Sequence, residues 1–538
     1  MTTSIDQSPA RAEIGGRWRW LLWALCLIVV GVFVIRIPGI VEPLGPDQGV
    51  YTTIGWAMSH GVALYRDVFE QKPPGIYLTY RLAFAVFGTN TSAVFWVDYL
   101  AAALTAVVLF DLARRLVSLR FGAIVAVVFA LGTMPAARQA YGGFLERAIS
   151  ETFISLFVTA AAWATVLAMS ATKNGWAIVA GLFVGTAAVY KPMAVVYWPA
   201  LVVWIWLLTD AARMRRFVMY SAMGAVVAPL VALTWMWTAG LLPAAWVALA
   251  EYNSAYLAVG DHGVFSILNE FAHQVWRRMK TDEVWALGTL GSAVAVLAWP
   301  WRRTRPGAAA SLGVLWLAAA FLAIVLNGPR MFQTYFMPSL VPLCLLAAWL
   351  VDRAFKRRSK VAAGLLVAFA GIMLFRSGSV QRAAGQTAWD TRHLLGQLER
   401  RDYLELFQSR TVPRPFSAAD NERLAEYLRS HTTPDERIFI FGMTASAYFQ
   451  SGRMPASRFV FVYPAVSNMT DRPEFRVETL ASELGQSMPR YIVLQRHNRD
   501  SFSGWRAADS FAAPPMAALL RRYTEETEIG GFVLYRLN

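Results

Sequence analysis

The sequence is poor in cysteine, histidine and charge. Only Cys26 and Cys344 occur among 538 residues, both in apolar runs and far apart, so neither a disulfide framework nor a cysteine-rich metal site is expected. The six histidines are scattered without paired spacing, which gives a zinc centre little support. Glycine motifs of the GxxxxGK[ST] or GxGxxG type are missing, which argues against a soluble nucleotide as direct substrate or energy source.

Apolar sequence dominates instead. Hydrophobic residues make up 56% of the chain, charged residues 16%, and the mean hydropathy is +0.41. Runs of about twenty apolar residues, long enough to cross ~30 Å of hydrocarbon as helix, recur up to residue 376 and then stop. The sequence therefore predicts a polytopic α-helical membrane protein with about eleven transmembrane helices. The expected spans are 20–37, 94–113, 121–137, 150–169, 175–190, 193–209, 217–239, 284–300, 308–326, 334–351 and 361–376.

The net charge of +15 does not indicate nucleic acid, because Lys and Arg gather in short links between apolar runs. Alternate links carry them, at 114–120, 213–216, 302–305 and 353–360. The positive-inside rule makes these links and the basic N-terminus, residues 1–19, cytoplasmic. An odd number of spans then puts the C-terminal region outside the cytoplasm.

Two regions lie outside the predicted spans. Residues 75–88 are apolar but only fourteen long and contain Arg81, which favours an interfacial or re-entrant helix in a first outer loop, 38–93. After the transmembrane domain, 20–376, helical patterns alternate with short apolar strands at 437–441, 491–494 and 532–537. We expect residues 377–538 to form a small extracytoplasmic α/β domain, with a helical connector near 384–408.

Polar residues concentrate at the outer end of the apolar runs. Residues 45–77 bring Asp47 and the Lys72-Pro73-Pro74 element to the water–lipid boundary. Glu151 lies one turn inside an apolar helix, where a carboxylate is costly without a partner, so a function and an ion pair with Arg147 or Lys191 are both open. Simpler interpretations are a helix N-cap for Asp47, before residues 48–59, and a snorkelling side chain for each charge at a helix end.

The order of these motifs resembles a known family. GPDQGVY, ALYRDVFEQKPPGIYLTY and GGFLERAISETF follow one another, with weaker matches in VYKPMA, NGPRMFQTYFMPSLVPLCLLAA and YFQSGRMPASRFVF. This order is similar to the bacterial dolichyl-phosphate-mannose-protein mannosyltransferase-like enzymes, a branch of the GT-C glycosyltransferases that includes the lipid A aminoarabinose transferases. One departure is Gln48, where many relatives carry a second acid.

The resemblance implies a GT-C-like fold and a reaction. A hexosyl or pentosyl unit would pass, with inversion, from a polyprenyl-phosphate donor to an acceptor hydroxyl on the outer face of the bacterial inner membrane. Glycolipid such as lipid A, polysaccharide and protein all stay open as acceptors; membrane lipid is a further partner. The implied roles are general base for Asp47, alone or with Glu151; donor phosphate binding for Lys72 and Arg330; and substrate contact for Tyr65, Tyr77, Lys191 and Tyr335, with Trp56 as a further stacking or lipid-lining ring.

Two alternatives accompany this prediction. A transporter or flippase is also helical and basic inside, although one-sided polar residues and an odd span count favour sugar transfer. A non-catalytic membrane partner would accommodate Gln48. No cofactor is firmly expected; the first-loop acids Glu42, Asp47, Asp67 and Glu70 either hold a divalent ion or form a solvated loop.

Overall fold

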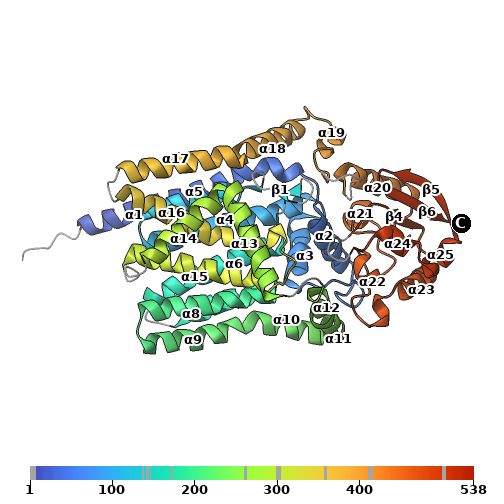
Figure 1. Cartoon of the computed structure of the whole chain (residues 1–538), viewed down its shortest axis with the longest axis horizontal. Helices are drawn as coiled ribbons and strands as arrows, with labels where there is room; N and C mark the ends of the chain where they lie inside the picture. Colours follow the sequence, from blue (N-terminus) through green and yellow to red (C-terminus); the bar gives the residue numbers. More distant parts are fainter. Residues whose placement is uncertain are drawn as a thin grey trace, which may run out of the picture.

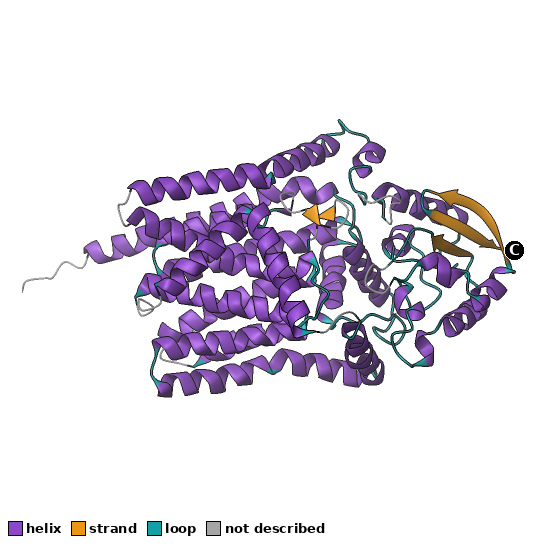
Figure 2. Cartoon of the chain, viewed as in Figure 1, coloured by secondary structure: helices purple, strands orange, loops and turns teal. Residues whose placement is uncertain are grey.

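A helical bundle and a smaller C-terminal domain make up the chain in the computed structural model (Figures 1 and 2). The structure describes residues 8–135, 139–140, 144–145, 147–170, 174–259, 263–298, 304–356, 360–409, 416–499 and 504–538. Parts of the basic N-terminus and of the links at 302–305 and 353–360 therefore lie outside the described residues. Helix α1 begins at the end of the bundle that lies away from the C-terminal domain (Figure 1).

The bundle contains a helix at every predicted span. Within the described ranges, seven segments are long and apolar enough to cross a membrane by themselves. They are Trp20–Val41, Ser92–Leu116, Ser150–Ser170, Ala211–Thr238, Gly307–Val325, Gln333–Lys356 and Lys360–Ser377. The other four predicted spans fall on the shorter apolar segments Leu119–Gly132, Gly175–Ala188, Pro192–Leu208 and Glu283–Leu297. The protein is thus a multi-span helical membrane protein, and residues 75–88 form the short helix α3 (Gly75–Phe87).

The elements of the bundle follow in chain order. They are α1 Ser8–Arg36, η1 Ile37–Val41, α2 Pro46–Ser59, α3, α4 Ser92–Leu116, α5 Leu119–Gly132, β1 Gln139–Ala140, β2 Phe144–Leu145, α6 Ser150–Ser170, α7 Gly175–Ala188, η3 Pro192–Val196, α8 Tyr197–Leu208, α9 Ala211–Ala225, α10 Val227–Thr238, α11 Leu242–Trp246, η4 Val247–Tyr252, α12 Asn253–Leu257, α13 Val264–Thr281, α14 Glu283–Leu297, α15 Arg305–Val325, η6 Gln333–Ser339, α16 Leu340–Lys356 and α17 Lys360–Ser377.

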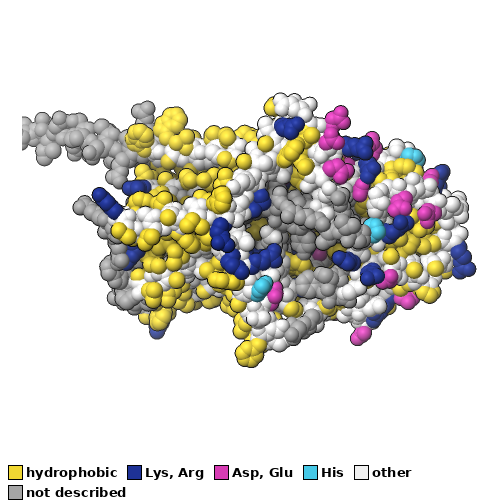
Figure 3. Space-filling model, turned by 45° about the horizontal axis from the view of Figure 1, so that its top comes forward, with side chains coloured by type: hydrophobic (Ala, Val, Ile, Leu, Met, Phe, Trp, Pro, Cys, Tyr) yellow, Lys and Arg dark blue, Asp and Glu magenta, His cyan; other side chains and the backbone are white. Residues whose placement is uncertain are grey.

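Large apolar side chains cover the outside of the bundle (Figure 3). Helices α1, α10 and α17 expose many of them, including Leu27, Val231 and Phe375. In a soluble protein such a surface would aggregate, whereas in a bilayer it faces lipid. Charged side chains gather instead at the edge of the bundle and over the C-terminal domain (Figure 3).

Helices α7 and α9 pack backbone against backbone through glycines. A Cβ atom on Gly181 would lie 1.8 Å from the Ser221 carbonyl oxygen, and one on Gly185 would lie 2.1 Å from that of Ala225. Gly224 meets Ile178 in the same way, at 1.9 Å. Small residues allow this approach inside a membrane, where dispersion contacts rather than water exclusion hold helices together.

The C-terminal domain contains a four-stranded sheet of order β3-β4-β6-β5. Strands β3 (Ile438–Phe441) and β4 (Tyr491–Gln495) are parallel, whereas β6 (Phe532–Leu537) pairs antiparallel with both β4 and β5 (Tyr523–Ile529). The predicted strands at 437–441, 491–494 and 532–537 are confirmed. The prediction missed β5, because its sequence YTEETEI is polar; as an edge strand it keeps most side chains in water.

Short helices connect and cover this sheet. They are α18 Ser379–Leu394, α19 Arg400–Leu404, α20 Ala418–His431, α21 Ser446–Ser451, α22 Tyr463–Val466, η7 Pro473–Phe475, α23 Val477–Ser487, α24 Ala507–Phe511 and α25 Pro514–Leu520. Helices α18 and α19 form the connector expected near 384–408. Helix α20 begins where the Ser417 side chain accepts from the Asp420 amide, a common N-cap.

The C-terminal domain docks on the first loop of the bundle. The amide of Phe69 donates to the Arg458 carbonyl at 2.8 Å, and its ring meets those of Phe459 and Phe475 at 5.5 and 4.9 Å. Thr53 on α2 donates to the Ala445 carbonyl at 2.8 Å. The loop that carries the candidate functional residues is therefore held between the bundle and the domain.

The glycine contact between α7 and α9 predicts a stability effect. Gly185→Val places side-chain atoms where the Ala225 backbone lies, so the helices must separate; overpacking of this kind costs about 1–3 kcal/mol or more. We expect a lower apparent melting temperature in detergent. Gly371→Val on α17, where a Cβ meets nothing within 4 Å, is the matched control. Equal melting temperatures for the two variants would contradict the close contact.

Candidate active site

Asp47 lies at the start of α2. The helix is capped by Gly45 and begins at Pro46, so Asp47 is its second residue and the alternative of an N-cap role is wrong. An acid in the first turn is favoured by the partial positive charge of the helix N-terminus. One turn later, the Tyr51 hydroxyl donates to Asp47 Oδ2 at 3.2 Å. The carboxylate is half-buried and keeps a second oxygen for another partner.

Gln48, at the position of the second acid of many relatives, has a definite structural task. Its Oε1 accepts from the Gly45 amide and its Nε2 donates to the Arg147 carbonyl, both at 2.7 Å. The side chain is only 1% exposed. A carboxylate could accept from Gly45 but could not donate to Arg147, so the amide ties the start of α2 to the segment before α6.

Lys72 projects toward the same place from the loop before α3. Its Nζ lies 3.4 Å from Glu70 Oε2 and 5.2 Å from the centre of the Tyr51 ring. Burial disfavours the ammonium, but Glu70 and Asp47 outweigh burial and raise the pKa of Lys72 above its usual range. Lys72 is therefore a permanent cation beside Asp47.

The tyrosines of this loop hold it in shape. Tyr65, in the left-handed region with φ 66°, donates its hydroxyl to the Lys72 carbonyl at 2.9 Å. Tyr77 donates to Glu70 Oε2 at 2.5 Å, and Glu70 is only 1% exposed. Both rings are buried and both hydroxyls are engaged within the loop. The two hydroxyls therefore brace the loop around Lys72, and contact of Tyr65 and Tyr77 with a substrate stays a prediction.

Gly75 brings a second charged pair to the site. Its amide donates to the Val189 carbonyl at 3.1 Å, and a Cβ would lie 2.8 Å from that oxygen, so a side chain does not fit. This contact sets the start of α3 against the end of α7, two residues before Lys191. Lys191 forms an ion pair with Glu151 and lies over the Tyr335 ring at 3.9 Å. Of the two partners considered for Glu151, Lys191 is the one observed.

Arg330 completes the cluster from the segment between α15 and η6. Its guanidinium is buried and stacks over the Tyr256 ring of α12 at 3.9 Å. Burial raises the pKa of Tyr256 to about 12, and Arg330 and Lys72 both oppose the rise. Lys72 also interacts electrostatically with Tyr256 and Tyr335.

Sequence reasoning missed Tyr51 and Tyr256, since buried tyrosines are common and their spacing carries no signal.

The four first-loop acids do not gather around one point. Glu42 pairs with Arg147, Asp67 with Arg66 and Glu70 with Lys72, while Asp47 accepts from Tyr51. Within the described parts of the chain, no group of three or more His, Cys, Asp or Glu side chains is placed to hold a metal ion. The alternative of a plain solvated loop is wrong for Glu42 and Glu70, which are buried.

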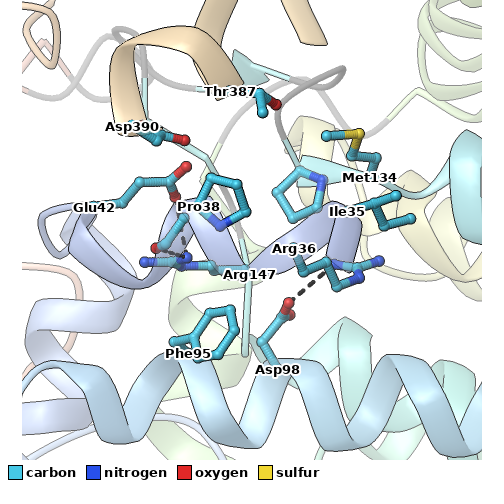
Figure 4. Close-up of a pocket in the computed structure, with 12 residues that line it drawn as sticks. Ile35, Arg36, Pro38, Glu42, Phe95, Asp98, Met134, Arg147, Thr387 and Asp390 are labelled. Carbon is cyan, nitrogen blue, oxygen red and sulfur yellow. Dashed lines mark hydrogen bonds and ion pairs between the residues drawn. The ribbon is translucent and has the colours of Figure 1, made fainter. Parts of the chain in front are cut away.

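A buried ionic network supports the site from the side of η1 (Figure 4). Arg147 contacts Glu42 at 3.1 Å and the Gly39 carbonyl at 2.5 Å, while Arg36 contacts Asp98 at 3.0 Å. The lining residues enclose a cavity of about 10 Å³, room for about one water molecule. The sequence signal that could have pointed to this network is Asp98, an acid inside the apolar run 94–113.

The network also reaches the C-terminal connector through Asp390 of α18. Burial raises the pKa of Glu42 well above its usual range; Arg147 opposes the rise and Asp390 adds to it. Burial raises the pKa of Asp390 as well, against hydrogen bonds from Tyr403 and Gln386 at 2.7 Å. Raised pKa values on two facing carboxyls favour one shared proton, which removes a repulsion between α18 and the first loop.

Segment 147–148 connects this network to both candidate catalytic acids. The Arg147 carbonyl accepts from Gln48 beside Asp47, and the Ala148 amide donates to Asp98 Oδ1 at 3.0 Å. Ala148 has φ 50°, an uncommon conformation for alanine, and the chain enters α6 two residues later. The relative position of Asp47 and Glu151 therefore depends on this segment.

Gln48→Glu tests the support of Asp47. The substitution removes the donor to the Arg147 carbonyl and buries a carboxylate beside it, a loss of about 1–3 kcal/mol or more. The apparent melting temperature in detergent is expected to fall by several degrees. Gln486→Glu, the same change at an exposed position of α23, is the control and should leave it unchanged. An equally stable Gln48→Glu protein would show that the amide is dispensable.

Comparisons with known proteins give a family match over part of the chain and one similar protein. Residues 71–237 match the family described as dolichyl-phosphate-mannose-protein mannosyltransferase, a segment that contains Lys72, Glu151 and Lys191 but not Asp47. The undecaprenyl phosphate-alpha-4-amino-4-deoxy-L-arabinose arabinosyl transferase 2 of Pseudomonas fluorescens is 25% identical over 346 residues. That match covers 60% of this chain and 59% of the relative's length.

Two solved structures share the architecture. ArnT from Cupriavidus metallidurans, in a crystal structure bound to undecaprenyl phosphate, is 16% identical with a TM-score of 0.57; the match covers 96% of this chain and 97% of that one. The oligosaccharyltransferase AglB from Archaeoglobus fulgidus, in complex with an inhibitory peptide and a dolichol-phosphate, is 13% identical with a TM-score of 0.51. That match covers 97% of this chain and 74% of that one. The chain therefore shares the fold of these two structures, and its residues 71–237 match the mannosyltransferase family.

Proposed function

We propose that the protein transfers a sugar, with inversion, from a polyprenyl-phosphate donor to an acceptor hydroxyl at the membrane surface. The observation that carries the proposal is the grouping of one half-buried carboxylate, Asp47, with the permanent cation Lys72 beside the same tyrosine, Tyr51. A single displacement at a sugar carbon needs a base on one side and a positive charge for the departing phosphate on the other.

Each reacting group then has a residue of this chain. Asp47 takes the proton of the acceptor hydroxyl as the acceptor oxygen attacks the anomeric carbon. The bond from that carbon to the phosphate oxygen breaks, and the electron pair leaves with the lipid phosphate. Lys72 and Arg330 stabilise this phosphate, whose negative charge grows during the step. The half-buried setting strengthens the attraction, because less water screens it.

The second pair orients the substrates in this proposal. Lys191 is compensated by Glu151 and lies over Tyr335, so it offers hydrogen-bond donors without adding net charge. Glu151 helps to orient the acceptor, while Tyr65 and Tyr77 act through the loop that they brace. A glycolipid, a polysaccharide or a protein hydroxyl all satisfy this chemistry.

A comparison of substituted proteins tests the base and the phosphate contact. Purified protein is incubated with radiolabelled undecaprenyl-phosphate sugars and envelope extract. We expect Asp47→Asn to lower the transfer rate by about 10²–10⁴-fold, the usual worth of general-base help. Lys72→Ala should lower it too, and Lys72→Arg should recover part of the rate because the charge returns.

Asp67→Asn is the matched control, since Asp67 is an exposed acid of the same loop that pairs with Arg66. It should transfer at the normal rate. Normal transfer by Asp47→Asn would disprove the base assignment. Movement of the donor across liposomes without any transfer would support a flippase instead.

For the location we propose the bacterial inner membrane, with the N-terminus in the cytoplasm and the C-terminal domain outside. In a protein with Cys26 and Cys344 replaced, a cysteine at 430, exposed on α20, should react with a membrane-impermeant maleimide in spheroplasts. A cysteine at 118, between α4 and α5, should react only after permeabilisation. Reaction of position 118 in intact spheroplasts would reverse the orientation.

A further inference from the structure

A second hollow lies apart from the Asp47–Lys72 cluster, between the first loop and the C-terminal domain. It has a volume of about 480 Å³ and shares no lining residue with that cluster. One wall comes from the end of α2 and the turn after α3, the other from α20 and α21. Its size is within the range of about 300–1,000 Å³ that small-molecule sites occupy.

The inner wall of this cleft is aromatic. Trp56 and Phe449 meet edge to face with centroids 6.2 Å apart, and Phe84 stacks behind Phe449 at 5.4 Å. These rings come from α2, α21 and α3, so the wall is fixed by packing between the bundle and the domain. Phe449 is only half-buried, so part of its ring is accessible from the cleft.

The outer wall is polar. Its carboxylate, guanidinium and amide groups are planar and can form two hydrogen bonds side by side. Glu422, Glu426 and Arg429 lie on one face of α20, four and seven residues apart. Glu422 is bound to Arg400, and Arg429 donates to the Gln450 carbonyl at 2.9 Å. Among the described residues, the buried Oε1 of Gln450 has no hydrogen-bond partner.

Asn90 lines the cleft from the turn after α3, where its side chain donates to the Phe87 carbonyl at 3.3 Å and accepts from the Ser92 hydroxyl and the Ala93 amide. This turn is exposed and begins at Gly88, whose φ of 85° suits glycine. The cleft therefore offers the Glu426 carboxylate, the Arg429 guanidinium and the Gln450 amide beside an aromatic wall. A lipid chain would leave these polar groups unpaired, and a phosphate would meet two carboxylates.

We propose that this cleft binds a saccharide unit of the acceptor. A sugar ring has hydroxyls around its edge, which suit the carboxylate and amide groups, and patches of C–H that suit an aromatic wall. The inference rests on the proposed sugar transfer, and it names the acceptor class as a glycan-bearing molecule.

Helix α2 sets the distance between the two sites. Asp47 is at its start and Trp56 lies nine residues further, which is about 14 Å along a helix that rises 1.5 Å per residue. Nine residues are about two and a half turns, so the side chains of Asp47 and Trp56 leave opposite faces of α2. An acceptor anchored in the cleft therefore needs several further units to reach Asp47. The same helix packs on the C-terminal domain, where Gly49 leaves no room for a side chain beside Ser446.

The test is direct binding of soluble sugars to the full chain. The protein is purified in a detergent without a sugar head group, because a maltoside would compete. Maltotriose, cellotriose and chitotriose are the probes, followed by saturation-transfer NMR and equilibrium titration. We expect at least one to bind, and Gln450→Ala with Glu426→Ala to weaken that binding about tenfold or more through two lost polar contacts.

Glu478→Ala, at an exposed position of α23 outside the cleft, is the control for folding and should bind as the unchanged protein does. In transfer assays the double variant should raise the acceptor KM at unchanged kcat. Binding that is equal in the double variant and the control, or no binding of any probe, would overturn the inference. Asp47→Asn should still bind the probes, because Asp47 does not line the cleft. Loss of transfer and loss of saccharide binding are therefore measured separately, and either proposal can fail without the other.

Discussion

The cost of burying charge next to a membrane governs this structure. A charged side chain away from water needs a partner or a hydrogen bond, and the site is built from such pairs. Lys72 lies beside Glu70, Lys191 beside Glu151 and Arg147 beside Glu42. The first pair lies within one loop, whereas the other two join distant segments of the chain, so the requirement for charge compensation also fixes the geometry of the site.

The pairs are connected through backbone as well as side chains. Gln48 ties α2 to Arg147, and Gly75 brings α3 against the end of α7. The first loop is then enclosed by the C-terminal domain through Phe69 and Thr53. A carboxylate and several cations therefore occupy fixed positions before any ligand arrives, which is the condition for electrostatic stabilisation of a developing charge.

The sequence predicted the helices and the charged residues of the candidate site well, because apolar runs and charges near a membrane each have a large effect on free energy. The apolar runs marked the helices, and Asp47, Lys72, Glu151 and Arg330, all costly at a membrane boundary, do lie in one region. It did less well where residue types are common. Contact of Tyr65 and Tyr77 with a substrate stays a prediction, and the sequence did not show that both hydroxyls brace the loop. A solvated loop was one alternative for Glu42 and Glu70, and both are buried. The polar edge strand β5 has no apolar alternation, so no pattern pointed to it.

The sequence by itself determined that this is a multi-span helical protein with a small α/β domain, because hydrophobic length and strand pattern are local properties. It also determined which charged residues need an explanation. Only the tertiary structure decided the partners: Lys191 rather than Arg147 for Glu151, and the Arg147 carbonyl for Gln48. Such partners come from segments about 40 and 100 residues apart, and packing of the whole bundle sets their distances.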